Sequence, residues 1–188
     1  VKDQRQEAME LEGKTLGLLG CGKIARSLAR KASQGLGMKV LAYSPSLTQD
    51  KVPKYIKVVK RDNVFKMADF LSVNLPATST TKGSIGSAEF TMMKETAFFI
   101  NTARGSIVRE KELMEALENK KIAGAAIDVF EEEPPKTDNE LLHLPNVLAT
   151  PHSAAQTKEA RFRVSLQLAE EIYRALQKRK LKWPVNKL

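Results

Sequence analysis

Short apolar runs alternate along most of this chain with segments of helical periodicity. The runs are rich in residues that favour β-strands, and they cover residues 15–19, 38–43, 55–59, 70–75, 97–100, 123–129 and 147–150. They are almost continuously apolar, whereas a strand with one solvated face alternates apolar and polar residues. The pattern therefore predicts a parallel sheet that is buried on both faces.

Between several of these runs, apolar residues recur three or four positions apart, as on one face of a helix. The first such segment carries Ile24, Leu28 and Ala32, others lie near residues 64–68 and 113–117, and the longest covers 157–177. We expect Gly35 and Gly37 to end the first helix. Strands that alternate with helices predict the α/β class, with a doubly wound parallel sheet of the Rossmann type.

Composition agrees with a globular protein. The chain has 188 residues, 42% hydrophobic and 28% charged, which excludes a disordered, collagen-like or coiled-coil protein. Its single cysteine excludes a disulfide framework and a four-cysteine zinc site, and fits a reducing compartment. No apolar run reaches the length of a membrane span, and no secretory leader is visible. We therefore expect a cytoplasmic protein with no membrane partner.

The net charge of +9 raises the question of a nucleic-acid partner. The lysines and arginines are scattered along the chain, without interleaved aromatic residues. The one compact basic run, at residues 178–182, follows the long helical segment and favours that helix's C-terminus. We expect no nucleic-acid partner, and micromolar binding that collapses with salt, without dinucleotide binding, is the sign that would reverse this.

A glycine-rich turn follows the first predicted strand and opens the first helix. It reads Gly20-Cys21-Gly22-Lys23-Ile24. The first glycine permits a tight turn, and the second lets backbone N–H groups approach a pyrophosphate at the helix N-terminus. Glycine turns between strands and helices are common, so the position inside a βαβ unit is what favours a dinucleotide site here. We interpret Cys21 as a small filler of this loop rather than a reactive thiol.

The end of the second strand bears on the choice of cofactor. An acidic residue there would bind the ribose 2′-hydroxyl of NAD, but the chain has Ser44. Ser44 and Ser46 could hydrogen-bond a 2′-phosphate, and Lys51 and Lys54 lie a few residues on, whereas the alternative is a solvated turn. We therefore expect NAD or NADP as cofactor.

Ligands of an open α/β sheet bind outside the carboxyl ends of its strands, so the residues that follow each run are candidates. These are Leu75 and Pro76, then Thr102, Ala103 and Arg104, then Asp128 and Glu133, and finally His152. Each has a structural alternative: a strand stop for Pro76, a surface side chain for Arg104, a cap for Asp128, a solvated acid for Glu133 and a structural imidazole for His152. Gathered at one sheet edge, they favour a reaction centre.

These side chains permit one specific chemistry. Arg104 can hold a substrate carboxylate, and His152 can give a proton to a carbonyl oxygen as hydride arrives from a reduced nicotinamide. Glu133 can orient that imidazole and raise its pKa, and Asp128 can accept a hydrogen bond from the nicotinamide carboxamide. The sum is reversible reduction of a 2-oxo acid to a 2-hydroxy acid, which needs no metal.

The chain resembles the D-isomer-specific 2-hydroxyacid dehydrogenases. The resemblance covers roughly residues 11–175 and is carried by four stretches, at residues 16–25, 93–105, 124–134 and 145–152. It implies that Arg104 anchors the substrate carboxylate, that His152 is the acid/base and that Glu133 is its partner. Ala25, Ser44 and residues 153–155 depart from the family pattern, which leaves the choice between NAD and NADP open.

The resemblance also concerns domain organisation. Family members carry a second, substrate-binding domain built from both chain ends, so residues 1–188 look like the dinucleotide-binding domain with crossings at both ends. We expect this chain to bind NAD(P) but to turn over substrate poorly without the missing domain. The resemblance further implies a homodimer. The competing function is a dinucleotide-sensing regulator or corepressor on the same fold.

Overall fold

The computed structural model describes residues 8–184. The chain divides after Pro151 into two compact units, of which the first carries a sheet and the second a long helix. The ends of the predicted crossing segments, residues 1–7 and 185–188, lie outside the described residues.

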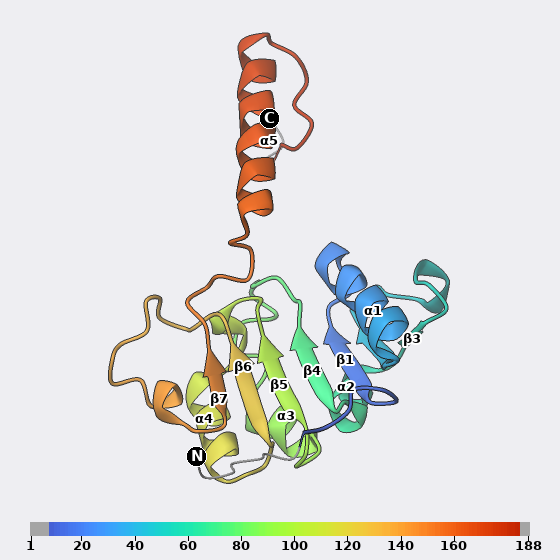
Figure 1. Ribbon diagram of the computed structural model, residues 1–188, viewed down its shortest axis with the longest axis vertical. Coiled ribbons are helices and arrows are strands. Elements are labelled where there is room, and N and C mark those ends of the chain that lie inside the picture. Colours follow the sequence, from blue (N-terminus) through green and yellow to red (C-terminus); the bar gives the residue numbers. More distant parts are fainter. Residues whose placement is uncertain (1–7, 185–188) are drawn as a thin grey trace, which may run out of the picture. The chain divides into compact units, whose positions relative to one another are not determined.

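The first unit is built on a parallel sheet (Figure 1). Its strands are β1 (Thr15–Leu19), β2 (Lys39–Tyr43), β3 (Ile56–Val58), β4 (Phe70–Val73), β5 (Phe98–Asn101), β6 (Gly124–Ile127) and β7 (Val147–Ala149). They lie in the order β3-β2-β1-β4-β5-β6-β7, and every pairing is parallel. The doubly wound fold predicted from the apolar runs is confirmed.

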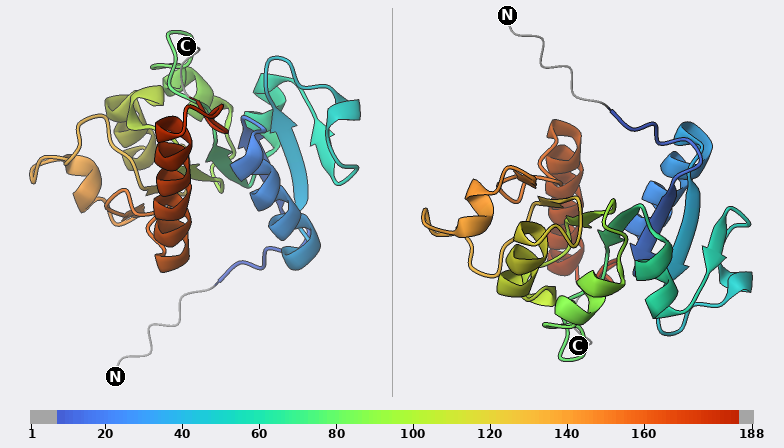
Figure 2. Two further views of the ribbon diagram at one scale, coloured as in Figure 1. Left: turned by 90° about the horizontal axis from the view of Figure 1, so that it is seen from above. Right: turned by 90° about the horizontal axis from the view of Figure 1, so that it is seen from below.

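Helices cover both faces of this sheet (Figure 2). They are α1 (Lys23–Leu36), α2 (Arg61–Met67), α3 (Ser87–Met92) and α4 (Glu110–Glu118), with 3₁₀ turns at Gln49–Lys51, Gly105–Ile107 and Glu140–His143. Alternate residues of β1 point to opposite faces, so Leu18 packs with α1 while Leu19 packs in the core shared by α2, α3 and α4. Burial on both faces explains why apolar and polar residues do not alternate along the strands.

Two local predictions about helices and strands were wrong. Gly35 does not end the first helix but lies within α1, whereas Gly37 does end it, as predicted, in the left-handed conformation. The predicted strand over residues 70–75 ends at Val73, so Leu75 belongs to the loop after β4. Gly35 is exposed on α1, and a glycine at such a position costs about 1 kcal/mol relative to alanine. The rest of the helix tolerates this cost.

Helix α3 has no counterpart in the prediction from sequence. It has only six residues, too few for a periodic pattern to be recognised. Its start is fixed by Glu89, whose carboxylate accepts a hydrogen bond from the Gly86 N–H at 2.9 Å. This is a capping interaction at one end of a short helix, so it leaves no repeated signal in the sequence.

The second unit contains α5 (Lys158–Leu176), which confirms the predicted long helix. The Thr157 side chain caps it by accepting a hydrogen bond from the Ala160 N–H at 3.0 Å. Past its C-terminus the Lys182 ammonium pairs with the Glu170 carboxylate. Among residues 8–184, no helix is both long enough and apolar enough to cross a bilayer.

Candidate active site

A cleft opens at the carboxyl ends of β1, β4 and β5. The strand order reverses direction between β1 and β4, which is where ligands of doubly wound sheets bind. The cleft has a volume of about 750 Å³. Its lining comes from the glycine loop, the segment after β4 and the segment after β5: Gly22, Lys23, Ile24, Ala25, Val73, Asn74, Leu75, Pro76, Ala77, Thr102, Ala103 and Arg104. Six predicted site residues are not among these lining residues: Gly20, Cys21, Ser44, Asp128, Glu133 and His152.

The glycine loop fits a dinucleotide. Gly20 has φ +91°, and a Cβ there would stand 2.5 Å from the Asn74 carbonyl oxygen, so the turn accepts only glycine. A Cβ on Gly22 would meet nothing within 4 Å, which leaves open space above the first turn of α1. Gly22 is the N-cap of this helix and has no side chain to cap it, so the first-turn N–H groups can receive a pyrophosphate.

Cys21 contributes a backbone hydrogen bond, and not its thiol, to the contacts of the glycine loop. Its side chain is buried in the core cluster that contains Ala25 and Ala29. Burial raises the pKa of the thiol, and the nearby Arg26 charge opposes that shift only in part. Its carbonyl oxygen accepts a hydrogen bond from Arg26 Nε at 3.1 Å. The interpretation of Cys21 as a loop filler therefore fits its surroundings.

Arg26 was not singled out from the sequence, yet it links the glycine loop to the segment that follows β2. Besides Cys21 it binds the Lys51 carbonyl oxygen, at 2.8 Å from Nη1. The Lys51 segment follows Ser44, which is half-buried at the end of β2 and accepts a hydrogen bond from the Leu47 N–H at 3.0 Å. The loop that would receive an adenosine ribose is thus tied to the glycine loop.

The side chain of Asn101 fixes the segment that carries Arg104 through two hydrogen bonds. Asn101, at the end of β5, is only 2% exposed. Its amide donates to the Arg104 carbonyl oxygen at 3.1 Å and accepts from the Ala103 N–H at 3.0 Å. The Arg104 side chain is exposed, and its Nη1 donates to the Ala103 carbonyl oxygen at 2.6 Å. The sequence signal that could have marked Asn101 is its position as a polar residue directly after the apolar run at residues 97–100.

Asp128 and Thr150 join the ends of β6 and β7. Asp128 is 4% exposed and accepts a hydrogen bond from Thr150 Oγ1 at 2.5 Å. The Thr150 N–H donates to the Ile127 carbonyl oxygen at 2.9 Å. A buried carboxylate is therefore held at the carboxyl edge of the sheet, two strands from the cleft's β4 wall.

The structure brings the Arg104 and Glu133 loops together. A Cβ on Gly105 would stand 1.9 Å from the Phe130 carbonyl oxygen and 2.5 Å from the Glu131 nitrogen, so the two backbones are in direct contact. Glu133 is exposed, and its Oε1 accepts a hydrogen bond from the Phe130 N–H at 3.1 Å. The predicted carboxylate anchor and the predicted partner of the acid/base therefore lie on adjoining loops.

His152 is the first residue of the second unit. Its φ of 49° lies in the left-handed region, which non-glycine residues seldom occupy and which often marks functional positions. Its partnership with Glu133 stays a prediction. Within residues 8–184, no three His, Cys, Asp or Glu side chains gather closely enough to hold a metal ion.

Comparisons with known proteins agree on one family. A family model described as "D-isomer specific 2-hydroxyacid dehydrogenase, NAD binding domain" matches residues 1–154. D-3-phosphoglycerate dehydrogenase of Archaeoglobus fulgidus is 42% identical over 165 residues, which are 87% of this chain and 31% of that protein. Hydroxypyruvate reductase of Thermotoga maritima is 41% identical over 169 residues, which are 89% of this chain and 54% of that protein.

A solved structure agrees with the sequence comparisons. D-lactate dehydrogenase of Lactobacillus jensenii, crystallised with NAD+, superposes with a TM-score of 0.88 at 32% identity. The superposition covers 96% of this chain and 58% of that one. This chain therefore spans about a third to a little over half the length of these relatives.

Proposed function

Because this chain belongs to the D-isomer specific 2-hydroxyacid dehydrogenases, as their NAD-binding domain, we propose that the protein is an NAD(P)-dependent D-2-hydroxyacid dehydrogenase. Its reaction is the reversible interconversion of a 2-oxo acid and a D-2-hydroxy acid. The observation that carries this proposal is the cleft, which runs from the glycine loop at Gly22 to the guanidinium-bearing loop at Arg104. One end suits a pyrophosphate and the other a substrate carboxylate.

A nicotinamide dinucleotide, when bound, supplies or accepts the hydride. The residues that would hold it are those of the glycine loop, Leu75 and Pro76 against the adenine, and Thr102 and Ala103 beside the nicotinamide half. Asp128 would accept a hydrogen bond from the carboxamide of the nicotinamide and so help to orient it. Ser44 puts no negative charge beside the ribose, so we expect NADP to be admitted as well as NAD.

The protein's own residues handle the carboxylate and the proton. Arg104 offers N–H groups in a planar fork that matches a carboxylate, and its loop is held by the buried Asn101. His152 gives a proton to the carbonyl oxygen during reduction and takes it back during oxidation. In this proposal Glu133 accepts a hydrogen bond from that imidazole and so orients the ring. The contact between the Gly105 and Phe130 backbones supports this division of roles, because it places Arg104 and Glu133 on adjoining loops.

The test is oxidation of NADH and NADPH by the full-length protein with glyoxylate, hydroxypyruvate and pyruvate. We expect turnover with at least one of these acids, and loss of it in Arg104→Met. Silence with every acid, together with intact dinucleotide binding, would favour the dinucleotide-sensing regulator instead.

Assembly and location follow as smaller proposals. We expect a homodimer, as the family resemblance implies, and light scattering on the purified protein tests this. The lone cysteine fits a reducing compartment, which favours the cytoplasm. The scattered basic residues favour the absence of a nucleic-acid partner, and a salt-dependent binding assay with DNA and RNA tests that.

A further inference from the structure

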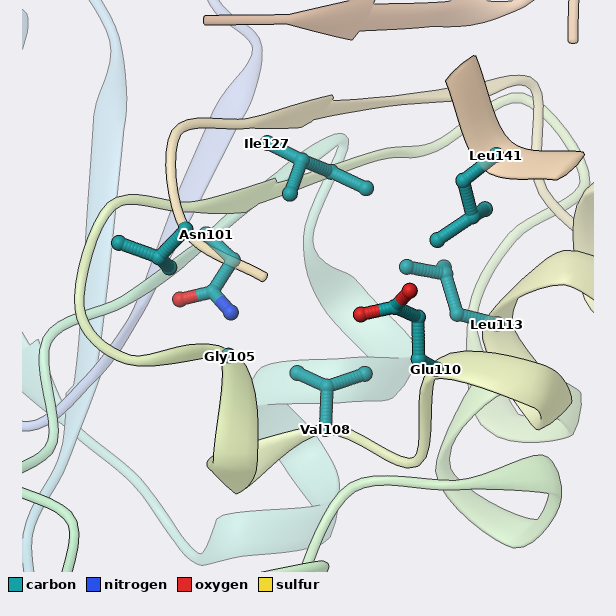
Figure 3. A pocket seen from close by; sticks show the side chains of 8 residues that line it. Asn101, Gly105, Val108, Glu110, Leu113, Ile127 and Leu141 are labelled. Carbon is teal, nitrogen blue, oxygen red and sulfur yellow. The ribbon is translucent and has the colours of Figure 1, made fainter. Parts of the chain in front are cut away.

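A small cavity lies beneath the two loops that carry Arg104 and Glu133. It has a volume of about 10 Å³, and most of its wall is apolar. Figure 3 shows two polar side chains that point into it from different elements, the amide of Asn101 and the carboxylate of Glu110. Asn101 holds the Arg104 loop, which leaves the purpose of Glu110 to be explained.

Glu110 is the first residue of α4, and its carboxylate holds the other loop at both ends. Oε2 accepts a hydrogen bond from the Glu131 N–H at 2.9 Å. Oε1 accepts one from the Asn139 amide at 2.6 Å. Asn139 in turn accepts from the Leu141 N–H at 3.0 Å, so its side chain is fixed. One carboxylate therefore holds the start and the end of the segment that contains Glu133.

The same loop is confined from the opposite side by Gly105. The Phe130 and Glu131 backbones pass so close to Gly105 that no Cβ fits between them. The Glu131 N–H that Glu110 binds thus belongs to the very peptide that touches the Arg104 loop. Loss of the Glu110 carboxylate would free this peptide to move away from Gly105, and Glu133 would move with it.

We propose that Glu110 is a positioning residue for the reaction, which holds Glu133 in place relative to Arg104. The proposal rests on the proposed function, because Glu110 acts only through Glu133. Its chemical basis is the acceptance of two hydrogen bonds by one half-buried carboxylate, since each such bond to a charged group is worth more than a neutral one.

Amide hydrogen exchange on the 188-residue chain tests the structural half of the proposal. Glu110→Gln keeps one acceptor oxygen and places an NH₂ group against one of the two donors. Exchange at the Glu131 amide should become at least about tenfold faster. Glu112→Gln is the matched control, because Glu112 lies on the same helix and accepts hydrogen bonds from the Ser87 N–H at 2.6 Å and Arg109 at 3.1 Å. That variant should leave Glu131 exchange unchanged, and equal rates in Glu110→Gln and wild type overturn the proposal.

Steady-state kinetics of the full-length protein, with glyoxylate and hydroxypyruvate as substrates, test the functional half. In Glu110→Gln, kcat should fall by at least about tenfold while KM for NADH stays within about twofold. Glu112→Gln should keep the wild-type kcat. In a Glu133→Gln background, adding Glu110→Gln should change kcat little, since both substitutions remove the same contribution.

The outcomes separate the two proposals. If Glu133→Gln alone keeps a normal kcat, the proposed role of Glu133 fails. If Glu133→Gln lowers kcat but the losses in the double variant are additive, Glu133 keeps its role and the proposal for Glu110 is wrong. If Glu110→Gln does not fold, Asn139→Ala removes one of the two partners of the carboxylate, and the same two measurements on it decide in the same way.

Discussion

Gly105 and Phe130 touch through their backbones, with the Phe130 carbonyl oxygen 1.9 Å from where a Cβ on Gly105 would lie. Because a backbone atom cannot swing aside as a side chain can, Gly105→Ala must displace one of the two loops. We expect a loss of about 1–3 kcal/mol or more in the free energy of unfolding, as for other insertions into close-packed regions. Urea denaturation of the chain measures it.

Gly35→Ala is the control for that substitution. Gly35 lies within α1, and a Cβ there would meet nothing within 4 Å. Alanine should therefore raise the free energy of unfolding by roughly 0.5–1 kcal/mol. Equal stability changes in the two variants would contradict the close contact at Gly105.

The two glycines of the dinucleotide loop should respond differently to alanine. Gly20→Ala clashes with the Asn74 carbonyl and has an unfavourable φ, so it should destabilise the fold. Gly22→Ala should leave stability within about 1 kcal/mol but weaken NADH binding by at least about tenfold, because its methyl group would enter the space for the pyrophosphate. Thermal denaturation and calorimetric titration measure the two effects, and NADH affinity unchanged in Gly22→Ala would place the cofactor elsewhere.

Asp69 should make stability depend on acid pH. Partial burial alone would raise the pKa of Asp69, but hydrogen bonds from Lys94 and the Thr15 N–H, with the charges of Lys94 and Lys14, lower it below its usual value. A lowered folded pKa stabilises the protein fully above about pH 4, and this stabilisation is lost as pH falls through the folded pKa. Asp69→Asn should therefore be less stable than wild type at pH 7, and the difference should shrink towards pH 2.

Urea denaturation across that pH range measures the effect of Asp69. The exposed Asp50 supplies the control, since Asp50→Asn should change stability little at any pH. If the difference in stability between Asp69→Asn and wild type stays constant from pH 7 to pH 2, the ionised carboxylate of Asp69 does not supply this stabilisation.

His152 should matter for turnover and not for cofactor affinity. In the full-length protein, His152→Gln removes the proton donor while keeping a polar side chain of similar size. We expect kcat to fall by about 10²–10⁴ and the dissociation constant of NADH to stay within about twofold. Stopped-flow kinetics and fluorescence titration measure these, and a normal kcat would remove His152 from the proposed role.

The sheet was predictable from sequence because burial on both faces leaves continuous apolar runs, such as the one that became β1. The glycine loop was predictable because its turn chemistry is local. Helix α3 was not, since six residues show no period, and neither was the exact end of β4 at Val73. Ends of strands depend on hydrogen bonds to neighbouring strands, which the local sequence does not record.

The candidate site likewise contains residues that could be predicted from the sequence and residues that could not. Arg104 and Glu133 could be selected as polar residues after apolar runs, because connectivity alone puts them at one sheet edge. Arg26 and Glu110 could not, since each acts through contacts with residues 21 or more positions away, at Lys51 and Glu131. Such supporting residues are ordinary helix residues in sequence, and only the fold shows what they hold.

Direct titration of the 188-residue chain with NADH and with NADPH tests the central claim, that the cleft above Gly22 is a dinucleotide site. We predict saturable binding at one site per chain, with measurable affinity for both cofactors and marked weakening in Gly22→Ala. A folded chain that binds neither dinucleotide would contradict the account.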